Sequence, residues 1–242
     1  MKKLITLLIL TMAFTMSAAA VPILCDSGIA NVLDLNGGVP DDQGCTFGGK
    51  TFDQFSVSTT SPGGAQIGIL DAVLRAIPGG MSVDLIFSVI TNPLVLIPDV
   101  DDPIDILFGY RVRGTELSGI DSAIGTHTGS VSIIENACAE EFAGVACGDL
   151  LASLAVSTPS LISNADEFSR LVDVFFVRKD IRIGLPIELN ITSAPLIETH
   201  SLSDFENSHH MNMNQVPEPA SLLLLGSGLI GLAFLRRRKK TS

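Results

Sequence analysis

Apolar and polar residues alternate with a period of two through much of this chain. In residues 81–90 every second position is apolar, and the positions between include Ser82, Asp84 and Ser88. Successive side chains of a β-strand point to opposite faces, so this period predicts strands with one buried face. The same kind of pattern predicts further strands over residues 55–59, 104–113, 130–134, 172–177 and 181–191.

Turn-forming residues separate these runs, at Pro62-Gly63-Gly64, Pro78-Gly79-Gly80 and Asn92-Pro93. Many short strands without long helical crossovers predict a mainly β fold, and we expect an antiparallel β-sandwich. Helix is expected only near residues 65–77, 137–146 and 166–172.

The first twenty residues predict an N-terminal signal peptide. Lys2 and Lys3 precede an apolar run over residues 4–14, and Ala18-Ala19-Ala20 supplies small residues for signal peptidase. We expect secretion machinery to export the chain and cleavage to follow Ala20.

A second apolar run covers residues 220–235. At about 1.5 Å per residue it spans roughly 24 Å as a helix, and Val216 and the arginine stems extend this toward the ~30 Å of a bilayer core. Cations after such a run stay cytoplasmic. The run therefore predicts a transmembrane helix, with residues 21–215 on the far side of the inner membrane. The basic end consists of Arg236, Arg237, Arg238, Lys239 and Lys240.

Pro217, Glu218 and Pro219 stand immediately before this apolar run. The three parts together resemble the PEP-CTERM sorting signal of exported proteins in Gram-negative bacteria that make exopolysaccharide. The resemblance implies that an exosortase, a membrane-bound processing enzyme, recognises Pro217-Glu218-Pro219. It also implies a membrane-anchored precursor whose mature form reaches the cell surface or the extracellular matrix, with exopolysaccharide as a candidate partner.

The charge of the chain argues against nucleic acid as a partner. The net charge is −11 at pH 7, and cations are concentrated near the two ends, so residues 21–215 are more acidic still. Such a surface repels phosphate backbones. It suits solubility, divalent cations or basic partners.

The four cysteines predict disulfides, because their number is even and the compartment beyond the inner membrane is oxidising. Three pairings are possible. We favour Cys25–Cys45 and Cys138–Cys147, since each closes a short local loop. A zinc site is the alternative, although no Cys-x-x-Cys pair is present.

The predicted organisation is a signal peptide at 1–20, a β-sandwich ectodomain at 21–200, a flexible spacer at 201–215 and the sorting signal at 216–240. The spacer is expected because residues 201–215 are polar and show no core pattern. His209 and His210 fall in it, and metal binding by this pair is the alternative.

Asp99, Asp101, Asp102 and Asp105 form the best candidate metal site. Calcium takes six to eight oxygen ligands, and carboxylates clustered in one turn can supply several of them. The order does not match an EF-hand loop, so a solvated acidic loop is the other interpretation. Apart from this possible calcium ion, no cofactor is expected.

No catalytic activity is expected, because the chain has no Gly-x-Ser-x-Gly elbow, His-Glu-x-x-His helix or phosphate loop. The prediction is a structural or adhesive protein of the surface or matrix. One alternative is a secreted hydrolase of exopolysaccharide, which requires His127 to meet Glu116 or Asp121. The other is a calcium-dependent binding module.

Overall fold

The computed structural model describes residues 23–25, 28–36, 44–60, 64–91, 103–144, 146–184 and 200–212. The predicted signal peptide and the segment 216–240 lie outside these ranges. Within them most residues belong to β-strands, and the one helical element is a short 3-10 helix, η1 (Val32–Asn36). The prediction of a mainly β chain is therefore confirmed.

The strands follow one another along the chain with short turns between several of them. In order they are β1 (Ile23–Leu24), β2 (Gly44–Phe47), β3 (Lys50–Thr59), β4 (Ala65–Ile77), β5 (Gly80–Thr91), β6 (Ile104–Ile124), β7 (His127–Thr128), β8 (Val131–Cys138), β9 (Leu150–Ser157), β10 (Ser163–Ile183), β11 (Ser201–Leu202) and β12 (Asp204–Asn212).

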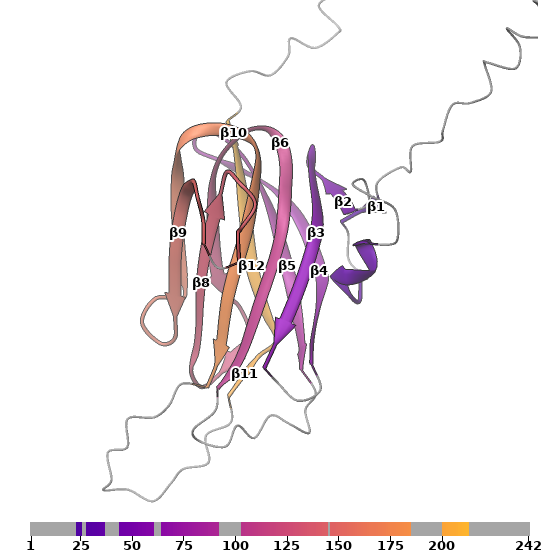
Figure 1. Cartoon of the computed structure of the whole chain (residues 1–242), viewed down its shortest axis with the longest axis vertical. Coiled ribbons are helices and arrows are strands. Elements are labelled where there is room, and N and C mark those ends of the chain that lie inside the picture. Colours follow the sequence, from indigo (N-terminus) through magenta and orange to yellow (C-terminus); the bar gives the residue numbers. More distant parts are fainter. Residues whose placement is uncertain are drawn as a thin grey trace, which may run out of the picture.

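Two long strands, β6 and β10, connect the layers of the fold. Each has 21 residues, and they pair with each other along most of their length, with register shifts between Glu167 and Val174. The first half of β6 pairs with β3 on its other side, whereas the second half pairs with β12. The sheet therefore divides, and its two branches form facing layers (Figure 1).

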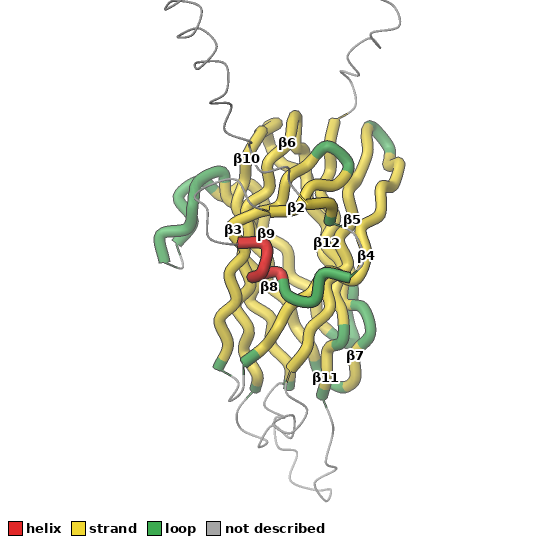
Figure 2. The backbone as a smooth tube through the Cα atoms, turned by 90° about the vertical axis from the view of Figure 1, so that its right-hand side faces the viewer, coloured by secondary structure: helices red, strands yellow, loops and turns green. Residues whose placement is uncertain are grey.

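The first layer has the strand order β1-β2-β3-β6-β10-β8-β9, and the second continues from β6 through β12 and β5 to β4. Figure 2 shows β3, β8 and β9 on one side of the fold and β12, β5 and β4 on the other. Among the described strands, neighbours are antiparallel except β1 and β2, which run parallel. The architecture is thus β-sandwich-like.

Alternate side chains of both layers fill the space between them. Phe87 of β5 lies with its ring centre 5.1 Å from Phe108 of β6 and 5.2 Å from Phe205 of β12. Burial of each such ring stabilises the fold by roughly 1.5–3 kcal/mol. The buried aromatic residues of the core are Phe52, Phe55, Phe87, Phe108, Tyr110, Phe168, Phe175 and Phe205.

The three predicted helices are not formed. Residues 65–77 are β4 and residues 166–172 lie within β10. Of the third range, residues 137–138 end β8, and residues 139–144 and 146 follow it without helix. Helix propensity differs by less than about 1 kcal/mol per residue among ordinary amino acids, so pairing with a neighbouring strand overrides it. For β4 that neighbour is β5, with which it pairs over almost its full length.

The prediction of a flexible spacer is wrong for its described part. Residues 201–212 form β11 and β12, and β12 pairs with β5 on one edge and with β6 on the other. His209 and His210 are buried. The polar composition that indicated a spacer instead belongs to a central strand whose side chains have hydrogen-bond partners inside the protein.

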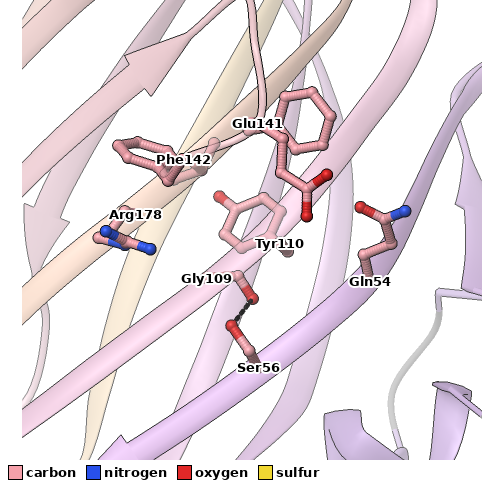
Figure 3. Close-up of a pocket in the computed structure, with 9 residues that line it drawn as sticks. Gln54, Ser56, Gly109, Tyr110, Glu141, Phe142 and Arg178 are labelled. Carbon is pink, nitrogen blue, oxygen red and sulfur yellow. Dashed lines mark hydrogen bonds between the residues drawn. The ribbon is translucent and has the colours of Figure 1, made fainter. Parts of the chain in front are cut away.

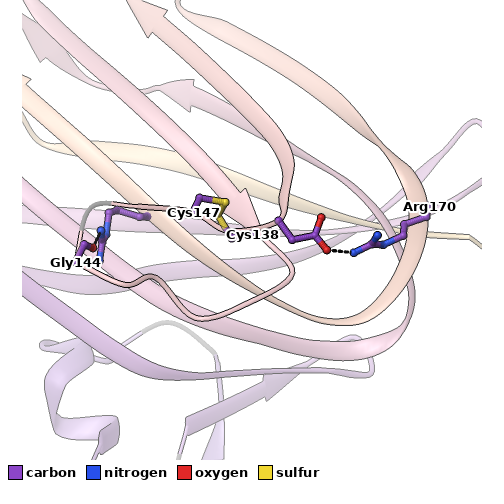
Figure 4. Close-up of a disulfide and its surroundings, with 6 residues drawn as sticks. Cys138, Gly144, Cys147 and Arg170 are labelled. Atoms are coloured by element: carbon purple, nitrogen blue, oxygen red, sulfur yellow. Dashed lines mark hydrogen bonds and ion pairs between the residues drawn. A yellow bond between two sulfur atoms is a disulfide. The ribbon is translucent and has the colours of Figure 1, made fainter.

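Both predicted disulfides are present. Cys25–Cys45 joins the end of β1 to β2, and Cys138–Cys147 closes the loop between β8 and β9 (Figure 4). Closing loops of this size stabilises a fold by roughly 3 kcal/mol each in the chain-entropy account. In the ranges described, no helix is both long and apolar enough to cross a membrane.

Candidate functional site

A group of polar side chains lies in the interior of the sandwich. Lys179 on β10 and Glu135 on β8 are direct partners in the strand register, so both point to the core, and Lys179 Nζ lies 2.5 Å from Glu135 Oε2. Asn207 on β12 and Ser122 on β6 are also direct partners, in the other layer. The two pairs meet, because Lys179 Nζ donates to Ser122 Oγ at 2.9 Å and Asn207 Nδ2 donates to Glu135 Oε1 at 3.0 Å.

The two charged members of this group are completely buried. The side chains of Lys179 and Glu135 are 0% exposed, and the Phe205 ring centre lies 5.2 Å from Lys179 Nζ. Burial lowers the pKa of Lys179, and the charge and hydrogen bond of Glu135 oppose that shift. Asn207 Nδ2 has a further acceptor in the Asp121 carbonyl at 3.2 Å, whereas no hydrogen bond to Asn207 Oδ1 is present among the described residues.

A second buried polar group surrounds His209. Its Nδ1 lies 3.3 Å from the Val83 carbonyl, which can only accept, so Nδ1 carries the proton and Nε2 accepts from the Tyr110 hydroxyl at 3.0 Å. Burial, followed by the charge of Lys50, lowers the pKa of His209 well below its ordinary value. Lys50 Nζ donates to the His209 carbonyl at 2.7 Å, and burial lowers the pKa of Lys50 to about 7 against the opposing charge of Asp84.

His210 points to the opposite face of β12, where it meets two carboxylates. Its Nε2 lies 3.1 Å from Asp121 Oδ2, and its Nδ1 lies 3.1 Å from Glu167 Oε1. Burial disfavours the charged ring, but hydrogen bonds and charges from Asp121 and Glu167 outweigh it and raise the pKa of His210. This contact ties β12 to β6 and β10 on the outer surface.

The same outer face carries a groove of about 560 Å³ over β10, β6 and β12. Arg75 crosses its edge, with Nε 3.0 Å from Asp84 Oδ2 and Nη2 3.4 Å from Glu206 Oε1. Burial, and then the charge of Asp84, raises the pKa of Glu206. The lining residues that carry polar side chains are Arg75, Asp121, Ser122, Ser163, Asn164, Glu206 and Ser208.

A second groove, of about 330 Å³, lies on the outer face of the other layer (Figure 3). The disulfide-closed loop brings Phe142 over β10, where the Arg178 guanidinium carbon lies 4.3 Å from its ring centre and Arg178 Nη1 donates to the Gly144 carbonyl. Gly109 forms the floor, and a Cβ there would lie 2.8 Å from Ser56 Oγ. The groove therefore combines an aromatic wall, a guanidinium and a floor where the Ser56 hydroxyl lies against the Gly109 backbone. Its other polar lining residues are Gln54, Ser56 and Glu141.

The predicted calcium ligands fall largely outside the described ranges, since Asp99, Asp101 and Asp102 precede residue 103. Asp105 is described, on β6, where burial and then the neighbouring Asp180 raise its pKa. Within the part of the chain that the structure describes, no group of three or more His, Cys, Asp or Glu side chains is arranged to hold a metal ion.

The residues named for a hydrolase have separate partners. His127 Nδ1 lies 2.8 Å from the Gly125 carbonyl, and the Glu116 amide donates to Asp173 Oδ1 at 3.3 Å. Glu116 lies about 26 Å from the end of β6 at ~3.3 Å per residue, and His127 follows that end. The two side chains are therefore far apart. Asp121 instead meets His210.

The buried Lys179 group was missed by sequence reasoning, although a signal was present. Every second residue of this part of β10 faces the core. Phe175, Val177 and Ile181 are apolar residues on that face, and Lys179 occupies the position between Val177 and Ile181. A lysine in the core phase of a strand requires a buried partner. Nothing in the alternation alone identifies Glu135 and Asn207 as its partners.

Comparison with known proteins gives one family match and one similar solved structure that we report. Residues 215–239 match the family described as PEP-CTERM protein-sorting motif. No curated protein matches. A solved structure of TmCBM61 in complex with β-1,4-galactotriose is similar at a TM-score of 0.28 and 8% identity, over 65% of this chain and 85% of that chain. A TM-score this low establishes neither a shared fold nor a shared ligand.

The matched motif implies an exported protein that exosortase-type machinery processes at the membrane. It contains Pro217, Glu218 and Pro219, and it begins three positions after Asn212, where β12 ends. The chain therefore carries a match to the PEP-CTERM protein-sorting motif at residues 215–239.

Proposed function

We propose that this chain is a structural or adhesive protein of the bacterial surface or extracellular matrix, delivered there through its sorting motif. The observation that carries the proposal is the sequence distance between motif and fold. Only Met213 and Asn214 separate the end of β12 from the matched residues. Five residues from Asn212 to Pro217 span at most about 18 Å, so an enzyme that holds the motif holds a sandwich close to the membrane surface.

The disulfides, the core and one surface groove of the folded part support a structural or adhesive role. Two disulfides and a continuous core favour a rigid body that persists outside the cell. We assign contact with extracellular polysaccharide to the groove of Figure 3, where Phe142 offers a ring and Arg178, Gln54 and Glu141 offer hydrogen-bonding groups. Pockets of this kind combine apolar walls with a few polar groups that orient the ligand.

The sorting part of the proposal is tested by Glu218→Ala in the full chain, expressed in a bacterium that contains an exosortase. We expect the wild type to lose its end near Pro217 and to appear at the surface or in the medium, and the variant to stay uncut in the membrane fraction. Asn214→Ala, which lies just outside the motif, is the matched control. The same cleavage state and the same location in all three proteins would contradict the proposal.

The adhesive part is tested with exopolysaccharide purified from the same bacterium. Co-sedimentation of the wild type and its loss in Phe142→Ala support the assignment of the groove. Leu150→Ala, a control of similar size on the neighbouring strand β9, should leave binding unchanged because its side chain is 54% exposed and does not line the groove. Equal binding by all three proteins would remove the groove from the proposal.

A hydrolase acting on exopolysaccharide is the second candidate, and the groove beside Arg75 is what favours it. Asp121 and Glu206 are diagonal neighbours on one face of β6 and β12. Burial and the charge of Asp84 raise the pKa of Glu206, as a general acid requires, while glycoside hydrolysis uses two such carboxyl groups. Release of reducing ends from the polymer by the wild type but not by Glu206→Gln is the expected result for this candidate. No release by the wild type would exclude it for that polymer.

A further inference from the structure

Three buried side chains in the core, Lys179, Glu135 and Asn207, have the chemistry of an amide-forming group. We propose that Lys179 and Asn207 become joined by an intramolecular isopeptide bond, formed between Lys179 Nζ and Asn207 Cγ with release of ammonia. Glu135 is the catalytic residue, because it contacts both reacting groups. The bond connects β10 to β12 and therefore one layer of the sandwich to the other.

Two independent contacts bring the reacting groups together. The two oxygens of the Glu135 carboxylate each bind one of them, Lys179 Nζ at 2.5 Å and Asn207 Nδ2 at 3.0 Å. Ser122 supplies the second link, since Lys179 Nζ lies 2.9 Å from its hydroxyl and Ser122 is the direct cross-strand partner of Asn207. Side chains of direct partners have Cβ atoms about 5 Å apart. The amine is thus held between two residues that both adjoin the carboxamide.

The surroundings favour reaction over a static ion pair. An amine is a nucleophile only without its extra proton, and burial among apolar side chains disfavours the charged form. The lowered pKa of Lys179 is consistent with this. Glu135, Lys179 and Asn207 are each 0% exposed, so bulk water does not compete for the carboxamide carbon. In addition, Asn207 Nδ2, which would leave, is the atom hydrogen-bonded to Glu135, the group that must protonate it.

The step balances without an added reagent. The Lys179 ammonium gives one proton to the Glu135 carboxylate, and the neutral amine forms a bond to Asn207 Cγ. Glu135 passes its proton to Nδ2, the bond from Cγ to Nδ2 breaks, and ammonia leaves. Glu135 then takes up the surplus proton from the new amide nitrogen. The products are a neutral amide, ammonia and a neutral carboxyl group, so a buried ion pair is replaced by uncharged groups, which a low-dielectric core favours.

The position of the bond has a mechanical consequence. β12 is the described strand nearest to the sorting motif, so a protein held through that motif transmits tension first to β12. A covalent link from Asn207 to Lys179 would carry this tension to β10 without separating the layers. This consequence rests on the proposed function, whereas the bond itself does not.

The experiment is peptide mapping of the protein recovered from cells that express the full chain. Reduction and alkylation, then trypsin with chymotrypsin, are expected to yield a branched species that joins residues 179–182 to residues 206–211 and weighs one ammonia less than the two peptides together. Both peptides are internal, so processing of the sorting motif does not alter the result. Without the bond, trypsin also cleaves after Lys179, so recovery of residues 180–182 and 206–211 only as separate linear peptides would overturn the proposal.

Three variants separate the bond from other chemistry. Lys179→Arg and Glu135→Gln should abolish the branched species, while Lys50→Arg should retain it, because Lys50 is a buried lysine that donates to a carbonyl of the main chain instead of a carboxamide. Asn207 precedes Ser208 and can lose ammonia by closing on its own backbone. A loss of ammonia found only on the linear peptide 206–211, in the wild type as in Lys179→Arg, would identify that ring closure and overturn the cross-link. Since the wild-type map decides the question, a variant that fails to fold does not leave it open.

Discussion

Strands β4 and β12 lie in the same layer with β5 between them. An apolar strand would be expected in the centre of the layer and a polar strand at its edge, but here the polar strand β12 is central and the apolar strand β4 is at the edge. β12 is polar, yet Asn207, His209 and His210 are 0%, 0% and 6% exposed. β4 is mostly apolar, with three isoleucines, two leucines and a valine, yet Leu70 and Leu74 are 47% and 46% exposed. Residue type therefore does not determine which strand is central.

Backbone pairing accounts for the difference. β12 pairs with β5 and β6, so both of its edges are used. β4 pairs with β5 on one edge, and on the other the described contact is a single bridge between Ile69 and Ile29. A central strand can bury polar side chains when each has a partner, as Asn207 has in Glu135 and His209 has in Tyr110. The contrast shows that polar pairing, and not only apolar burial, specifies the middle of this sheet.

The largest effect should come from the apolar anchor of the central strand. Phe205→Ala removes a ring that is fully buried against Phe87 and Phe108, and we expect a loss of about 3–5 kcal/mol in the free energy of unfolding. Leu70→Ala on β4 should change it by less than about 0.5 kcal/mol. Denaturant unfolding of both variants is the measurement. Equal losses would mean that β4 is covered in solution and the comparison of the two strands is invalid.

A smaller effect is expected at the polar centre of β12. His209→Leu leaves the Tyr110 hydroxyl and the Val83 carbonyl without this partner, at a cost of about 1–3 kcal/mol. Adding Tyr110→Phe removes the hydroxyl, which is one of the two groups that His209→Leu leaves without this partner. The double variant should therefore be more stable than the sum of the single losses, measured as a coupling in a double-mutant cycle. Additive losses would show that the hydrogen bond contributes nothing to stability.

The subtlest test compares two adjacent histidines on opposite faces of β12. The raised pKa of His210 means that its contribution is fully present below pH 6.5 and is lost as pH rises through the pKa of the folded state. The lowered pKa of His209 has the opposite sign, because the unfolded chain binds a proton below pH 6.5 that the folded protein excludes.

Unfolding at a series of pH values checks both signs. Relative to the wild type, His210→Gln should be most destabilising at acidic pH and less so as the solution becomes alkaline. His209→Gln should become relatively less destabilising as pH falls below 6.5. Parallel stability curves for the wild type and both variants would show that neither ring is perturbed as described.

Local patterns predicted the secondary structure well where burial is one-sided. The alternation in residues 81–90 and 104–113 reports one face against the core, and these residues form β5 and β6. The patterns failed where a strand departs from that condition. β4 exposes apolar side chains at an edge, and β12 buries polar ones in the centre, so the first resembled a helix and the second resembled a linker.

The functional features of the chain likewise include one that a local pattern identifies and one that it does not. The sorting motif was evident from contiguous residues, because Pro217, Glu218 and Pro219 stand together before an apolar run and a basic end. The buried group, by contrast, joins residues that are far apart in sequence. Glu135 is 44 positions from Lys179 and 72 positions from Asn207. Only strand register brings such distant positions together.

The sequence by itself determined the features that depend on near neighbours: the β period, the short loops that Cys25–Cys45 and Cys138–Cys147 close, and the motif at 215–239. The tertiary structure alone decided which strand lies in the centre and which polar groups share a carboxylate. The physical reason is that hydrogen bonds between strands and desolvation of charges depend on partners remote in sequence, and no local pattern encodes who those partners are.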